Sequence, residues 1–156
     1  MLSEFAGARS VRILPRRFCP AASLAVREKK PYIELFRRGM RTAVYEAYIQ
    51  SLRTRLESGG AKVDVFSKWP PQFVVCMWSA ARRRDLARRA TTHDAVVVLG
   101  CDAAVETARS AIEPTGCRVI PGMEVEGIIN VIPTVRFPFN VSLEVVSVTR
   151  VLEHQG

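Results

Sequence analysis

An unbroken apolar stretch, VVVLG at residues 96–100, limits most strongly how this chain can fold. A strand that is apolar on both faces must be covered on both faces, which is typical of parallel sheets flanked by helices. DAVVVLG (94–100) runs directly into AAVETARSAIE, which predicts a helix at 102–113, and CRVI (117–120) begins another strand. Strand, helix and strand in this order predict a right-handed parallel crossover.

The chain before residue 94 repeats this alternation of strands and helices. The apolar spacing of two residues in strands and near four in helices separates the two kinds of element. The elements predicted there are strands at 31–36, 61–67 and 73–79 and helices at 40–58 and 80–90. We therefore expect an α/β fold of three layers, with a mainly parallel, doubly wound sheet of the Rossmann-like or flavodoxin-like kind.

The first thirty residues differ from the rest in charge and pattern. They hold seven Lys and Arg against two Glu, a net charge of +5 within a total of +8, and they show no steady period. We expect a poorly ordered basic tail at 1–30 and a single α/β domain at 31–156. Two alternatives for the tail are an arm that binds nucleic acid or a membrane surface, and an organelle transit peptide.

The character of the sequence changes again after Pro121. GIINVI (127–132) and SLEVVSVTRV (142–151) have the composition of strands with no helix between them. They predict either an antiparallel edge of the same sheet or a surface for contact between two copies in a homo-oligomer. No run reaches the ~18 apolar residues that a membrane span requires. We expect a cytoplasmic location with reduced thiols.

Ligands of open parallel sheets bind outside the carboxyl ends of the strands. The residue types that follow the predicted strands are basic groups, tryptophans, glycines and carboxylates. The candidate ligand-binding residues are Arg37, Arg38, Arg41, Lys68, Trp69, Trp78, Ser79, Gly100, Asp102, Gly122 and Glu124. Basic side chains near a helix start favour an anionic small molecule. GCDAA at 100–104 lacks the later glycines of dinucleotide and P-loop motifs.

Cys101 is the candidate catalytic residue, because it falls at the start of the helix predicted at 102–113. The helix dipole favours a thiolate there, whereas the neighbouring Asp102 opposes a second negative charge. The alternative is that Cys101 is a small buried side chain in a close turn. Cys76 also lies at the carboxyl edge and approaches Cys101 if strands 73–79 and 94–100 are neighbours, whereas Cys117 begins its strand at the opposite end.

Other chemistry has weaker support in the sequence. The four cysteines lack the close spacing of a metal site, so we expect no structural metal, and no cofactor is indicated. The helix at 80–90 carries a dense basic cluster that is either a solvated face or a contact surface for nucleic acid or an acidic protein. The cluster comprises Arg82, Arg83, Arg84, Arg88 and Arg89.

FVVCMWS followed by DAVVVLGCDAA resembles uncharacterised small α/β proteins of methanogenic archaea. It is also similar to the iron–sulfur delta subunit of methanogen hydrogenases, which has a Cys-x-Trp strand and a later strand ending in Gly-Cys. The resemblance covers residues 72–105. The paired cysteines that hold a cluster in that subunit have no counterpart beside Cys76 or Cys101.

Three functions remain open from the sequence. The first is binding of an anionic small molecule at the carboxyl edge of the sheet, with no reaction assigned and enzymatic activity undecided. The second is a thiol-linked or metal-linked redox accessory protein that uses Cys76 and Cys101. The third is an interaction protein that uses the basic helix.

Overall fold

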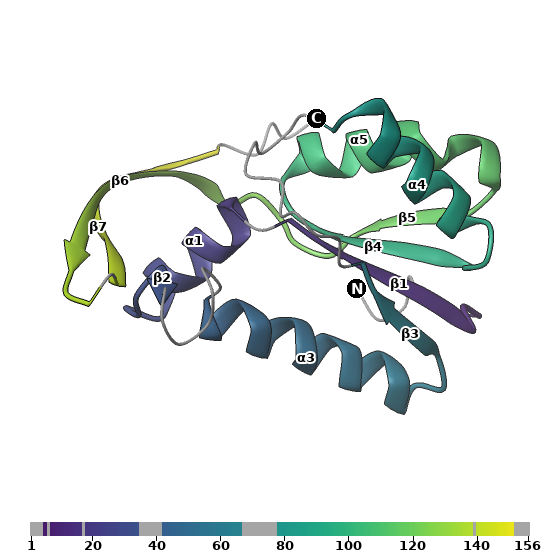
Figure 1. Cartoon of the computed structure of the whole chain (residues 1–156), viewed down its shortest axis with the longest axis horizontal. Helices are drawn as coiled ribbons and strands as arrows, with labels where there is room; N and C mark the ends of the chain where they lie inside the picture. Colours follow the sequence, from purple (N-terminus) through teal and green to yellow (C-terminus); the bar gives the residue numbers. More distant parts are fainter. Residues whose placement is uncertain are drawn as a thin grey trace.

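The computed structural model describes residues 5, 7–16, 18–34, 42–66, 78–138 and 140–151. Its main sheet has four parallel strands in the order β3-β1-β4-β5 (Figure 1). The strands are β1 (Ser10–Pro15), β3 (Lys62–Val65), β4 (Ala95–Leu99) and β5 (Arg118–Pro121). The α/β class expected from the alternation of strands and helices is therefore confirmed.

Helices cover both faces of this sheet, as the unbroken apolar content of 96–99 requires. On one face, Val97 and Leu99 pack with α1 (Cys19–Arg27) and α3 (Ala43–Ser58). On the other face, Val96 and Val98 pack with α4 (Ala80–Ala90) and α5 (Asp102–Ile112). Figure 1 shows α3 and the pair α4 and α5 on opposite sides of the strands. Because side chains alternate along β4, the strand contributes residues to two separate hydrophobic cores, one on each face of the sheet.

The helices begin where the sequence supplies capping residues. The Thr42 hydroxyl accepts a hydrogen bond from the Tyr45 N–H at 3.3 Å at the start of α3. The Ser79 hydroxyl accepts one from the Arg82 N–H at 3.4 Å at the start of α4. Both are standard N-cap bonds that satisfy an amide left unpaired by the first helical turn. No helix among the described residues is long and apolar enough to cross a bilayer.

The N-terminal segment is the largest departure from expectation. Instead of a basic tail, residues 10–15 form an inner strand of the sheet, paired with β3 on one side and β4 on the other. Val11 and Ile13 are completely buried and Leu14 nearly so. The nearby arginines hide the short apolar strand in the sequence. The free energy gained by burying these three side chains outweighs the cost of the local charge.

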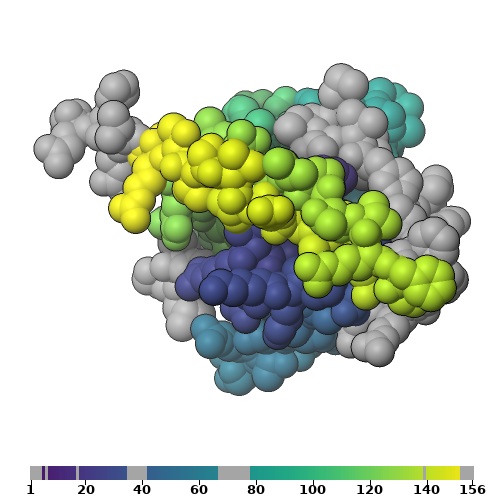
Figure 2. Space-filling model, turned by 90° about the vertical axis from the view of Figure 1, so that its left-hand side faces the viewer, coloured from purple at the N-terminus to yellow at the C-terminus, as the bar shows by residue number. Residues whose placement is uncertain are grey.

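The last two strands form a separate sheet, not an edge of the parallel one. This sheet has the order β2-β7-β6 and is antiparallel. Its strands are β2 (Ile33–Glu34), β6 (Gly127–Arg136) and β7 (Asn140–Arg150). Figure 2 shows β6 and β7 lying across one end of the molecule, beside α1. The segment 31–36 was expected to form a parallel strand, but its described part, Ile33–Glu34, belongs to this antiparallel sheet. The strand predicted at 73–79 lies almost wholly outside the described residues.

Candidate functional site

The carboxyl edge of the parallel sheet is built from the turns that follow β1 and β4. These strands are neighbours, and Pro15 pairs with Leu99 at their ends. The chain then turns to opposite faces, because α1 packs with the Val97 face and α5 packs with the Val98 face. The two turns therefore diverge at this point of the edge. In open α/β sheets, connections that diverge in this way form a crevice outside the carboxyl ends of the two strands.

Arg16 is the charged residue at this junction. Its backbone N–H donates to the Leu99 carbonyl at 2.9 Å, which continues the β1–β4 pairing by one bond. Its guanidinium carbon lies 5.2 Å from the centroid of the Trp78 ring, within the range of a cation–π contact. Trp78 in turn stacks on Phe66 with ring centroids 6.1 Å apart. The aromatic pair therefore holds the arginine over this edge.

Gly100 permits the close approach of these turns. A Cβ atom at Gly100 would lie 2.8 Å from Cγ of Arg16 and 2.9 Å from Cβ of Ala104. Such distances are shorter than van der Waals contact, so a side chain here displaces Arg16 or the first turn of α5. Gly100 thus sets how near Arg16 lies to the start of α5.

Cys101 is the N-cap residue of α5, as its place in the sequence predicts. Its side chain makes no capping hydrogen bond. Its carbonyl accepts bonds from the Ala104 and Val105 N–H groups at 2.8 and 3.1 Å. The half-buried thiol packs against the core of the Val98 face. Asp102 is exposed in the first turn of the helix.

Two tyrosines of α3, on the Val97 face of the sheet, donate hydrogen bonds to backbone carbonyls at the ends of neighbouring strands. The Tyr45 hydroxyl donates to the Leu99 carbonyl at 3.4 Å, and the Tyr48 hydroxyl donates to the Gly122 carbonyl at 3.4 Å. Burial raises the pKa of a third tyrosine, Tyr32, to about 12. Tyr45 and Tyr48 were missed as site residues because they occupy the apolar stripe of a helix, where only a core role is visible in the sequence.

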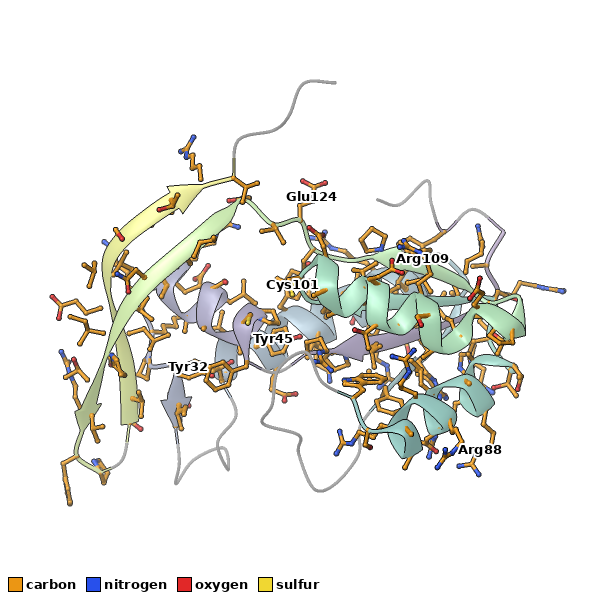
Figure 3. All side chains as sticks on the ribbon, turned by 90° about the horizontal axis from the view of Figure 1, so that it is seen from above. Tyr32, Tyr45, Arg88, Cys101, Arg109 and Glu124 are labelled. Carbon is orange, nitrogen blue, oxygen red and sulfur yellow. The ribbon has the colours of Figure 1, made fainter. Side chains whose placement is uncertain are left out.

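The remaining predicted site residues divide into several groups. Ser79 has a capping role at α4. Gly122 is buried, and a Cβ there would lie 2.7 Å from side-chain atoms of Leu99 and Val97, so its role is packing. Glu124 is exposed on the loop after β5 and points away from the protein (Figure 3). The predictions for Arg37, Arg38, Arg41, Lys68, Trp69 and Cys76 lie outside the described residues.

Arg16 is a further residue of this edge that the sequence does not reveal. The composition of residues 1–30 predicts a basic tail, so the predicted carboxyl edge does not include the turn that follows β1. The available signal was the apolar spacing of Val11, Ile13 and Leu14, followed by a proline and a second apolar segment.

The basic cluster of α4 is partly engaged within the protein. Arg88 and Arg89 both contact the buried carboxylate of Asp85, at 2.7 and 3.3 Å. Arg83 donates to the Ser110 hydroxyl at 2.6 Å. Arg84 is exposed, and Arg88 keeps 78% of its side-chain surface exposed despite its ion pair. Figure 3 shows Arg88 on α4 at a distance from Cys101, so this arginine does not belong to the carboxyl edge.

The amino edge of the sheet holds a different polar group. Arg12 is 6% exposed and donates from Nη2 to Asp64 at 2.6 Å. His93 contacts the same carboxylate, with its Nε2 atom 3.3 Å from Oδ2 of Asp64. The hydrogen bond from Arg12 lowers the pKa of Asp64. Cys117 is half-buried at this edge, opposite Cys101 as predicted, and burial together with Asp94 raises the pKa of its thiol.

These two environments predict different thiol reactivities. Cys101 is expected to react with iodoacetamide faster than Cys117 at neutral pH, because the raised pKa of Cys117 reduces its thiolate fraction and thiolate is the reactive form. Peptide mass spectrometry after timed quenching gives both rates. In urea the two rates should converge, and equal rates in the folded protein would contradict the expectation.

In the described part of the chain, no group of three His, Cys, Asp or Glu side chains is placed to hold a metal ion. Comparison with known proteins adds no assignment: no family model, no curated protein and no solved structure matches this chain. The candidate site at the carboxyl edge is therefore identified only from the geometry of this structure.

Proposed function

We propose that this chain binds a small anionic molecule at the carboxyl edge of its sheet, between the turn after β1 and the start of α5. The observation that carries the proposal is the position of Arg16 beside the first turn of a helix whose N-cap side chain makes no capping bond. Backbone N–H groups and the dipole of such a turn attract negative charge. The guanidinium adds a charged donor suited to phosphate or carboxylate oxygens.

The strand order supports the same position. Counted within the sheet, β3-β1-β4-β5 is the order 2-1-3-4, which agrees with the beginning of the flavodoxin-like doubly wound arrangement. In such sheets the ligand binds where the connections leave adjacent strands toward opposite faces, which here is the junction of β1 and β4. The Asp102 carboxylate offsets part of the positive potential of Arg16 and the α5 N-terminus. We therefore expect the anionic group of the ligand to contact Arg16 and not the outer side of the helix.

A titration with inorganic phosphate tests this function. We expect the amide NMR resonances of residues 100–103 to shift in the unaltered protein. Arg16→Ala should weaken the binding about tenfold, because a hydrogen bond to a charged group is lost. The matched control is Arg53→Ala, which removes an exposed arginine of α3 that pairs with Glu57 far from this edge.

Two results would argue against the proposal. The first is a titration in which the amides of 100–103 do not shift while others do. The second is equal affinity in the Arg16 and Arg53 variants. Either result would remove the β1–β4 junction as the binding position.

A further inference from the structure

Strand β6 forms one edge of the antiparallel sheet. Within the described residues its neighbour is β7, on one side, and the ladder joins Gly127 to Arg150 and Arg136 to Asn140. Alternate residues of this ten-residue strand therefore direct backbone N–H and C=O groups to the other side, where Pro133 has no N–H to offer. An edge strand of this length is a template for pairing with another strand unless charges, proline, β-bulges or coverage protect it. Pro133 lies within β6, and the β6–β7 register shifts between Asn130 and Val131.

The interior of β6 carries no such protecting charge. Every residue from Gly127 to Val135 is uncharged. Ile128, Ile132 and Val135 are 67, 55 and 69% exposed. Ile128 and Ile132 lie on the same face of the strand, because side chains alternate with a period of two. Exposed apolar side chains along an unpaired edge indicate a contact surface.

The charges stand at the two ends of the strand and have opposite signs. Glu126 directly precedes β6, and Arg136 is its last residue. Both side chains are exposed, and neither forms an ion pair in the part of the chain that the structure describes. A strand with a negative start and a positive end complements a second copy of itself in antiparallel orientation, because each end then meets the opposite charge.

We propose that two copies of this chain pair through β6, antiparallel and about a two-fold axis at Val131. This register places Glu126 of each copy opposite Arg136 of the other and Val131 opposite its own equivalent. The two three-stranded sheets then join into one of six strands. Isologous contact of this kind closes on itself and forms a dimer without further growth.

The register also brings the exposed apolar side chains together. Ile128 of one copy lies diagonal to Ile132 of the other on one face, within reach of long side chains. On the opposite face, Ile129 lies opposite Pro133 and Gly127 lies opposite Val135. Pro133 has no N–H to donate, which an edge strand tolerates, so apolar contact supplies more of the association at that position.

Cysteine cross-linking tests the register directly. Cα atoms of directly opposed residues in an antiparallel pair lie about 4.5–5.5 Å apart, within the range of a disulfide. Val131→Cys, mildly oxidised with oxidised glutathione, should give an inter-chain disulfide between two residue-131 peptides. The matched control is Ile128→Cys, whose equivalents lie six residues apart along the ladder, about 20 Å, and should not join.

Charge exchange provides a second test that leaves the interior of the strand unaltered. Glu126→Arg or Arg136→Glu alone should raise the dimer dissociation constant about tenfold, because attraction becomes repulsion at both ends. The double exchange should restore it. Sedimentation velocity over a range of concentrations measures all four proteins. A monomer at every concentration, equal cross-linking at residues 128 and 131, or a dimer unaffected by the single exchanges would overturn the proposal.

Discussion

The Ile13→Ala variant is expected to lose about 3 kcal/mol of its free energy of unfolding, because the substitution leaves a cavity in the centre of the sheet. Ile13 is completely buried and pairs with Val65 on one side and Val97 on the other. Urea denaturation followed by circular dichroism measures the change. The prediction separates an inner strand from a dispensable tail, since a tail residue can be truncated with little effect on stability.

The control for Ile13 is Val146→Ala in β7, where the side chain is 56% exposed. Exposed truncations usually change stability by less than about 0.5 kcal/mol. If Ile13→Ala were as mild as Val146→Ala, residues 10–15 would not form the inner strand in solution.

The Asp64→Ala variant is expected to lose about 2 kcal/mol, because Arg12 then remains buried without its counter-ion. Nε and Nη1 of Arg12 already lack a hydrogen-bond partner among the described residues, so the Asp64 carboxylate is the group that offsets burial of this charge. The loss is smaller than for a fully buried pair, since 52% of the Asp64 side-chain surface is exposed and water partly replaces the carboxylate.

A second substitution identifies the cause of this loss. Arg12→Met in the Asp64→Ala background removes the stranded charge and fills similar volume, so it should recover most of the stability. Further loss in the double variant would show that Asp64 acts in another way. Chemical denaturation of the two single variants and the double variant completes the cycle.

The same pair sets a dependence of stability on pH. The hydrogen bond from Arg12 lowers the pKa of Asp64 below its ordinary 3.8. The folded state then holds fewer protons than the unfolded state, so this contribution is present above the ordinary pKa and is lost as the pH falls through the lowered one. Asp64→Ala should therefore flatten the acid limb of the stability profile.

Much of the fold could be predicted from the sequence because its elements have local signals. The helix expected at 80–90 matches α4, and the strand at 94–100 and helix at 102–113 match β4 and α5 within one residue at each end. The antiparallel sheet could not be placed in this way. Its pairing of Ile33 with Val141 joins residues far apart in the chain, and alternation alone does not select a partner.

The candidate site was partly predictable for the same reason. Gly100 and Cys101 stand at a strand-to-helix transition that is visible in the sequence. Arg16 follows a strand whose middle residue is a buried arginine, so the composition of the segment indicates an exposed tail. The ion pair with Asp64 that permits this burial spans 52 residues of sequence and has no local signature.

The inner position of β1 also affects how the chain acquires its fold during synthesis. Val11 pairs with Val63 and with Ala95, so β1 lacks its second neighbouring strand until 84 further residues have been made. At about 5–20 residues per second this interval is about 4–17 s. Throughout it the apolar side chains of Val11, Ile13 and Leu14 have no complete core, which makes the nascent chain a substrate for chaperones that shield such segments.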